Sequence, residues 1–189
     1  MILPIVSFGS PVLRKKCNEI HPNYPELDLL ISNMWETMYN ANGVGIAAPQ
    51  INKSIRVFLI DTTPFFDDDD ESIDNKEKIV KKVFINAKIF EEKGEMWNFK
   101  EGCLSIPNVR EDVSRKTNIT IEYLDQRFVK HRDTYSGITA RVIQHEYDHI
   151  EGVLFTDRIS LLRRKMIKRK LNDISKGKVD VSYKMKFLK

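Results

Sequence analysis

The stretch QHEYDHIEG, residues 144–152, carries the side chains with the clearest chemical potential in this chain. His145 and His149 are four positions apart, and Glu146 follows the first histidine directly. On a helix, side chains four positions apart lie on one face, so the two imidazoles can bind one metal ion. Glu146 can then accept a proton from a water molecule on that ion. The pattern predicts a hydrolytic metal site, with a pair of surface histidines as the alternative.

A catalytic metal site needs a third protein ligand and one open position. The extended motif HExxHxxGxxH supplies a third histidine, but Phe155 stands at that position here. The remaining candidates are carboxylates, histidines and thiols elsewhere in the chain: Asp157, Asp173, His21, His131, Cys17 and Cys103. Cys103 stands out because it lies in EGCLSIP, next to a glycine and shortly before a proline. The spacing of these residues leaves the third ligand open.

Helical periodicity predicts three helices that frame this chemistry, at residues 24–43, 136–152 and 157–177. In the second, Ile138 and Val142 share the face of the two histidines, so this face should be buried. The inward faces of the other two should consist of Leu27, Leu30, Ile31, Met34, Trp35 and Met38 in the first and Ile159, Leu162, Met166 and Ile167 in the last.

Runs at residues 55–61, 81–90 and 118–125 are rich in β-branched and aromatic side chains, which indicates strands. Helix, strands, helix and helix follow one another without strand–helix alternation. This order predicts an α+β fold with mostly antiparallel sheets packed around a central HExxH helix, and with a C-terminal helix.

Length and composition are those of one globular domain, with 189 residues, 41% of them hydrophobic and 31% charged. No apolar run approaches the roughly 20 residues that span a bilayer, so we expect no membrane segment. Two cysteines are too few for a disulfide scaffold and indicate a reducing compartment. No basic stretch precedes the short apolar patch at the start, so we interpret it as mature protein rather than a secretory signal.

Charge is unevenly distributed along the chain. Residues 158–189 contain twelve Lys or Arg and two Asp or Glu, a balance of +10, whereas the whole chain carries +4. This end is either a solvated helix face followed by a frayed tail or a contact surface for RNA. An acidic segment at about residues 62–78 lacks the ligand spacing of a calcium loop, so we expect a solvated loop. We predict one catalytic domain at residues 1–177 and a basic, disordered tail at 178–189.

Three stretches, GVGIAAPQ (43–50), EGCLSIP (101–107) and QHEYDH (144–149), resemble the three motifs of the peptide deformylase family, in the family's order and at about its spacing. The similarity extends from PVLRKKC to GVLFTDRIS. It implies an α+β enzyme that removes the N-formyl group from the formylmethionine of new polypeptides and releases formate. The alternatives are an endopeptidase, which would need a downstream carboxylate ligand, and an RNA-binding module with a structural metal, which would need a fourth ligand.

The resemblance also implies which residues form the site. The metal ligands would be Cys103, His145 and His149, holding one divalent ion per chain, natively Fe²⁺, with Zn²⁺, Ni²⁺ or Co²⁺ able to replace it. The catalytic groups would be the Glu146 carboxylate, the Gln50 side-chain amide and the Leu104 backbone N–H. The substrate-binding residues would be Val44, Gly45, Gly102, Arg110 and Val142, the last as part of an apolar slot for the methionine side chain.

Partners and location follow from the same resemblance. The substrates would be nascent formyl-Met polypeptides, and the polyanion that the basic C-terminal helix contacts would be the ribosome. Formylmethionine starts translation in bacteria and in organelles of bacterial descent. We therefore expect either a plastid or mitochondrion, with an import sequence removed, or a bacterial cytoplasm.

Overall fold

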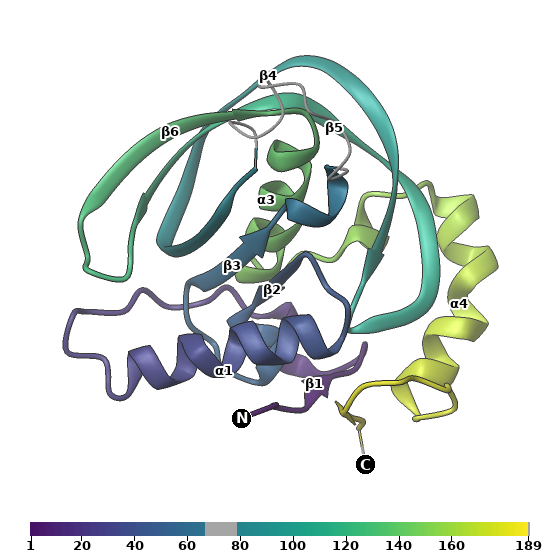
Figure 1. Ribbon diagram of the computed structural model, residues 1–189. Coiled ribbons are helices and arrows are strands. Elements are labelled where there is room, and N and C mark those ends of the chain that lie inside the picture. Colours follow the sequence, from purple (N-terminus) through teal and green to yellow (C-terminus); the bar gives the residue numbers. More distant parts are fainter. Residues whose placement is uncertain (67–78, 189) are drawn as a thin grey trace.

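A computed structural model describes residues 1–66 and 79–188 of the chain. One antiparallel sheet has the strand order β2-β3-β4-β5-β6 and curves around the helix α3 (Figure 1). Its strands are β2 (Gly45–Ala47), β3 (Val57–Asp61), β4 (Lys81–Cys103), β5 (Ile106–Leu124) and β6 (Lys130–Ser136). The predicted α+β class with largely antiparallel strands is confirmed. Strands β2 and β6 form the two edges of this sheet.

All three predicted helices are present: α1 (Leu27–Asn40), α3 (Gly137–Ile150) and α4 (Leu161–Ser175). Within residues 1–66 and 79–188, four short 3-10 helices connect the elements: η1 (Pro11–Arg14), η2 (Ala48–Ile51), η3 (Thr63–Phe65) and η4 (Phe155–Asp157). As predicted, α1 buries a stripe that includes Ile31, Met34 and Met38. None of the described helices is long and apolar enough to cross a membrane.

Strands β4 and β5 are much longer than the sequence predicts and form one curved hairpin that arches over α3 (Figure 1). Residues 90–96 in the middle of β4 are all exposed, so this part lacks the alternation that marks a half-buried strand. Its register against β5 shifts at several points, and such irregularities bend a strand. The hairpin closes where Cys103 pairs with Ile106, so Leu104 and Ser105 form a two-residue turn.

The predicted inward face of α4 is wrong at two positions. Leu162 is 70% exposed and Met166 is 63% exposed, whereas Ile167 is buried. The side chains that face the core are Ile167, Leu171 and Ile174. They recur at helical spacing on the face next to the predicted one. An ion pair between Arg163 and Glu111, with Nε–Oε2 2.7 Å, also connects α4 to β5.

Residues 178–188, most of the segment predicted as a basic, disordered tail, are described by the structure. Strand β7 (Met185–Lys186) pairs in parallel with β1 (Ile5–Val6), and together they form a small second sheet. Gly177, with a φ of +73°, lets the chain turn back after α4 toward β1. Most of the predicted acidic loop lies outside the described residues, since these omit 67–78.

Candidate metal centre

Cys103, His145 and His149 form one cluster, with a ligand atom from each within 4.8 Å of the others. Cys103 ends β4, whereas the two histidines lie one turn apart on α3. The Cys103 Sγ is 3.3 Å from the His149 Nε2. A tetrahedral ion with bonds of about 2.0–2.3 Å holds its ligands roughly 3.5 Å apart, so these side chains fit a metal ion. Thiolate and imidazole donors favour iron, zinc, nickel or cobalt over magnesium or calcium.

The other candidates for the third ligand lie elsewhere. His131 bonds Asp125, Asp157 pairs with Arg14, and the buried Cys17 packs in a hydrophobic cluster. Among the described residues, Cys103, His145 and His149 are the one group with ligand geometry, without a carboxylate or a fourth ligand. The cluster therefore offers neither the downstream carboxylate of the endopeptidase alternative nor the closed shell of a structural site.

Glu101 orients the first histidine, a contact that the sequence did not predict. Its Oε2 lies 2.9 Å from the His145 Nδ1, which leaves the Nε2 of that ring free to face a metal. Burial raises the pKa of the Glu101 carboxyl, but hydrogen bonds from Arg115 and His145 outweigh burial and hold the pKa well below its usual range. Glu101 is therefore a carboxylate at neutral pH, and it belongs to the same EGCLSIP stretch as Cys103.

A buried network of charges supports Glu101. Arg115 of β5 donates to both carboxylate oxygens of Glu101, at 2.7 and 2.9 Å, and its third nitrogen donates to Asp148 at 2.7 Å. Arg141 donates to Glu101 at 2.9 Å, and Arg158 pairs with Asp148 on the far side. Each buried charge thus has a partner of opposite sign, as burial requires. No sequence signal marked Arg115, because it lies outside the strand predicted at residues 118–125; in the structure it occupies an inward position of β5.

Glu146 is buried beside the cluster, and its Oε2 has no hydrogen-bond partner in the described part of the chain. Burial raises the pKa of this carboxyl to about 7. The backbone of Gly45 covers it so closely that a Cβ at this position would lie 2.5 Å from the Glu146 Oε1. A buried carboxyl with an unpaired oxygen and a near-neutral pKa is suited to accepting and returning a proton.

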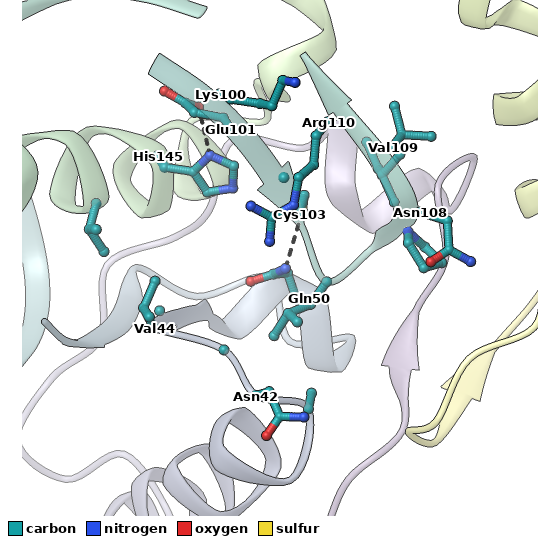
Figure 2. A pocket seen from close by; sticks show the side chains of 18 of the residues that line it. Asn42, Val44, Gln50, Lys100, Glu101, Cys103, Asn108, Val109, Arg110 and His145 are labelled. Carbon is teal, nitrogen blue, oxygen red and sulfur yellow. Dashed lines mark hydrogen bonds and ion pairs between the residues drawn. The ribbon is translucent and has the colours of Figure 1, made fainter. Parts of the chain in front are cut away.

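Gln50 presents its amide nitrogen to the cluster. Its Oε1 accepts a hydrogen bond from the Ala47 N–H at 2.9 Å, which fixes the orientation of the amide. Its Nε2 then lies 3.5 Å from the Cys103 Sγ and 3.4 Å from the Ser105 Oγ. Figure 2 shows Gln50 and His145 on two sides of Cys103, with Arg110 reaching into the space between them.

A cavity of about 800 Å³ opens onto this cluster. Every residue expected to bind substrate lines it: Val44, Gly45, Gly102, Arg110 and Val142. Phe65, Phe99 and Ile138 add an apolar surface near Val142, and Leu104 lies on the wall as well. The wall also includes residues 180–183 from the C-terminal segment, for which the sequence predicted no role.

Comparisons with known proteins found relatives that match almost the whole chain. A model of the polypeptide deformylase family matches residues 2–165. The chain is 60% identical to a peptide deformylase of Christiangramia forsetii, over 99% of this chain and 96% of that protein. It is 58% identical to a peptide deformylase of Flavobacterium johnsoniae, with the same coverage of both proteins.

A crystal structure of a peptide deformylase from Legionella pneumophila has the same fold. The TM-score is 0.79 at 35% identity, and the alignment covers 94% of this chain and 98% of the other. The chain therefore belongs to the peptide deformylase family, the metal-dependent hydrolases that remove the formyl group from the N-terminal formylmethionine of new polypeptides.

Proposed function

We propose that this deformylase works with one metal ion held by Cys103, His145 and His149. The observation that supports this most is the meeting of one thiol and two imidazole nitrogens within 4.8 Å, beside a buried and unpaired Glu146 carboxylate oxygen. A divalent ion bound by these residues would supply Lewis acidity, which would lower the pKa of a water molecule toward neutrality and polarise the formyl carbonyl. The native ion is Fe²⁺, and Zn²⁺, Ni²⁺ or Co²⁺ can replace it, because all suit a mixed thiolate and imidazole site.

Glu146 moves the proton. It accepts the proton that the attacking water loses as the new C–O bond forms at the formyl carbon. It then gives this proton to the amine nitrogen as the C–N bond breaks, so formate and a free amino terminus leave. The raised pKa of about 7 suits both steps, and a cation beside Glu146 favours its deprotonated form at the start of the cycle.

Two neutral donors stabilise the negative charge that develops on the formyl oxygen. One is the Gln50 Nε2, whose direction is fixed by the Ala47 N–H behind it. The other is the Leu104 N–H, in the turn directly after Cys103. Donors that are already aimed at the developing charge need no reorganisation during the reaction, which is the basis of their effect on rate.

The peptide substrate binds along the cavity as an added strand. Strand β2 lies at the edge of the sheet, and Val44 and Gly45 line the cavity, so the backbone there can pair with an extended peptide. Phe99, Ile138 and Val142 form the slot for the methionine side chain. Gly102 leaves room for the peptide backbone, and Arg110 faces the residues that follow methionine.

The two cysteines provide a matched test. Cys103→Ser should lose both the metal and the release of formate from a formyl-Met peptide, whereas Cys17→Ser should keep both. Cys17 is buried in a hydrophobic cluster and does not belong to the ligand group, so it controls for the loss of a thiol as such. Metal analysis of anaerobically purified protein and a formate assay are the measurements. A Cys103→Ser protein with full metal content and turnover would contradict the assignment.

We also infer that the outer face of α4 contacts the ribosome. Exposed apolar residues, Leu161, Leu162 and Met166, lie among exposed lysines and arginines on this helix. Such a mixed face fits a surface of RNA and protein better than it fits water alone.

Both curated relatives are bacterial, which favours the bacterial cytoplasm over the organelle that the sequence also allowed.

A further inference from the structure

The C-terminal segment returns from α4 to the catalytic cavity. Residues 180–183 line the cavity, and the Asn108 side chain donates a hydrogen bond to the Asp180 carbonyl at 3.0 Å. Directly after them, β7 pairs with β1. The match to the deformylase family model ends at residue 165, so it assigns no role to this segment.

Tyr183 makes the contact that matters most for the site. Its hydroxyl donates to the Leu104 carbonyl at 2.7 Å, although the two residues are 79 positions apart in the chain. Tyr183 and Leu104 are both partly buried against the same hydrophobic cluster, which holds the phenol ring in place. This tyrosine therefore connects the C-terminal segment to the residue that follows the Cys103 ligand.

The same turn is held from the N-terminal side. The Phe8 N–H donates to the Ser105 carbonyl at 2.8 Å. Phe8 lies just after β1 and Tyr183 just before β7, so the two paired strands bring both donors to the turn. Two successive carbonyls of the two-residue turn, those of Leu104 and Ser105, are thus fixed by one small sheet.

We propose that Tyr183 is a positioning residue of this enzyme: its hydroxyl fixes the Leu104–Ser105 turn and so aims the Leu104 N–H at the formyl oxygen. Only two soft dihedral angles connect the Leu104 carbonyl to its own N–H, so holding the carbonyl restricts the direction of the donor. In the described part of the chain, no backbone carbonyl accepts from the Leu104 N–H, which leaves it available for substrate. The inference rests on the role proposed above for Leu104.

Tyr183→Phe tests this with little change to packing, since the ring stays. The matched control is Tyr39→Phe, which removes a hydroxyl that donates at the same 2.7 Å, to Asp61 and away from the turn. We expect Tyr183→Phe to lower kcat per bound metal about three- to tenfold, the usual effect of one neutral hydrogen bond. KM should change by less than about twofold, because the lost alignment acts in the transition state. The control should match wild type in both.

Hydrogen exchange gives a readout that does not depend on turnover. Backbone amides of residues 103–105 should exchange faster in Tyr183→Phe than in wild type or Tyr39→Phe, because the turn has lost one anchor. A Tyr183→Phe enzyme with wild-type kcat overturns the proposal, and so does a loss of activity fully explained by lost metal. A wild-type enzyme that releases no formate would instead refute the proposed function, and that measurement precedes the variants.

Discussion

The position of the Glu146 carboxyl depends on Gly45, whose backbone packs closely against it. The carboxyl is buried, and the glycine backbone lies where any β-carbon would collide with it. The proposed proton acceptor is thus confined between α3 and β2. Two changes at this contact separate the chemistry of the carboxylate from its position.

Glu146→Gln keeps the shape of the side chain but removes the group that accepts the proton. We expect the turnover number to fall by roughly two or more orders of magnitude, as for other general acid–base residues. The metal content should stay at the wild-type level, since Glu146 is not a proposed ligand. A formate assay together with metal analysis checks both. Near-wild-type turnover would mean that another group carries the proton.

Gly45→Ala should push Glu146 away from the cluster, because the added Cβ would lie 2.5 Å from its Oε1. A displacement of this size can lower the rate by about 10² even where no reacting group is lost. We expect kcat to fall, while the metal remains bound and the protein stays folded. Gly102→Ala provides a contrast: its nearest contact is the flexible Arg110 side chain at 3.3 Å, so Glu146 should stay in place, and any effect on the peptide path should appear in KM rather than in kcat. A fully active Gly45→Ala enzyme would show that Glu146 tolerates the shift.

At the scale of the elements, the Asp157 carboxylate connects η4 to η1. The sequence had offered Asp157 as one of the candidates for the third metal ligand. Asp157 instead pairs with Arg14, accepts from the Leu154 N–H at 2.9 Å and lies 3.6 Å from Arg164. Partial burial raises the pKa of the Asp157 carboxyl, but these contacts, that of Arg14 first, lower it overall.

Because the folded-state pKa of Asp157 is lowered, its stabilising effect is complete above the unfolded value of about 4. The effect is lost as the pH falls through the folded-state pKa. Asp157→Asn should therefore lower Tm at pH 7, by up to about 4 °C for a partly exposed ion pair, and should have less effect at about pH 3. Glu19→Gln, at an exposed position, is the control. A gap in Tm between wild type and Asp157→Asn that is equal at both pH values would contradict this.

Helix α4 carries the proposed ribosome contact, but some of its basic side chains already have hydrogen-bond or ion-pair partners within the protein. Arg163 is paired with Glu111, and the Arg164 Nε donates to the Thr156 carbonyl at 2.9 Å. Reversing either charge would disturb the fold as well as the surface. Three exposed lysines of α4 have no ion pair in the described part of the chain and are better targets: Lys165, Lys168 and Lys170.

Changing these three lysines to Glu should weaken binding to ribosomes, and binding of the wild type should fall steeply as salt rises. Turnover of a short formylated peptide should not change, because α4 lies outside the cavity. Co-sedimentation with cognate ribosomes at low and high salt is the measurement. The control carries the same charge change at Lys15, Lys53 and Lys88, which are exposed elsewhere. If both triple variants pelleted as wild type does at low salt, α4 would have no part in ribosome binding.

At the scale of the whole molecule, the proposed metal connects parts of the chain that are far apart in sequence. Cys103 lies in the β4–β5 hairpin and the two histidines lie on α3. A bound ion would therefore join α3 to the sheet that curves around this helix. Removal of the metal by a chelator should lower Tm together with activity, because binding to the folded state stabilises it. Adding Zn²⁺ or Ni²⁺ should restore Tm. An unchanged Tm after complete removal of the metal would mean that the site is equally well formed without it.

The parts of this molecule that local sequence patterns encode could be predicted from the sequence. The spacing of His145 and His149 and the periodicity of their helix are short-range signals, and the helix is where they predict it. Residues 90–96 in the middle of β4 have no such pattern, because they are all exposed and are held in the strand by pairing with β5. The buried face of α4 lies in one hydrophobic cluster with Val109 and Val113 of β5, which are far away in sequence, and periodicity alone cannot supply those contacts.

The charges around the site could not be predicted for the same reason. Arg115 meets Glu101 and Asp148 across 14 and 33 positions, and only the folded sheet brings them together. The family resemblance stood in for this missing information at Cys103, Gln50 and Leu104. It was silent about Glu101 and about Tyr183, whose contact with Leu104 depends on the pairing of β1 with β7.

The position of β2 at an edge of the sheet also has a consequence for the range of polypeptides on which one enzyme can act. In the proposed binding mode, a peptide added to this edge would be held through its main chain, which is the same in every protein, and only the first side chain would enter a shaped slot. Selection then falls on the start of the chain and leaves the remaining sequence free to vary. A cell that begins every protein with the same residue could in this way process its entire output with a single catalyst.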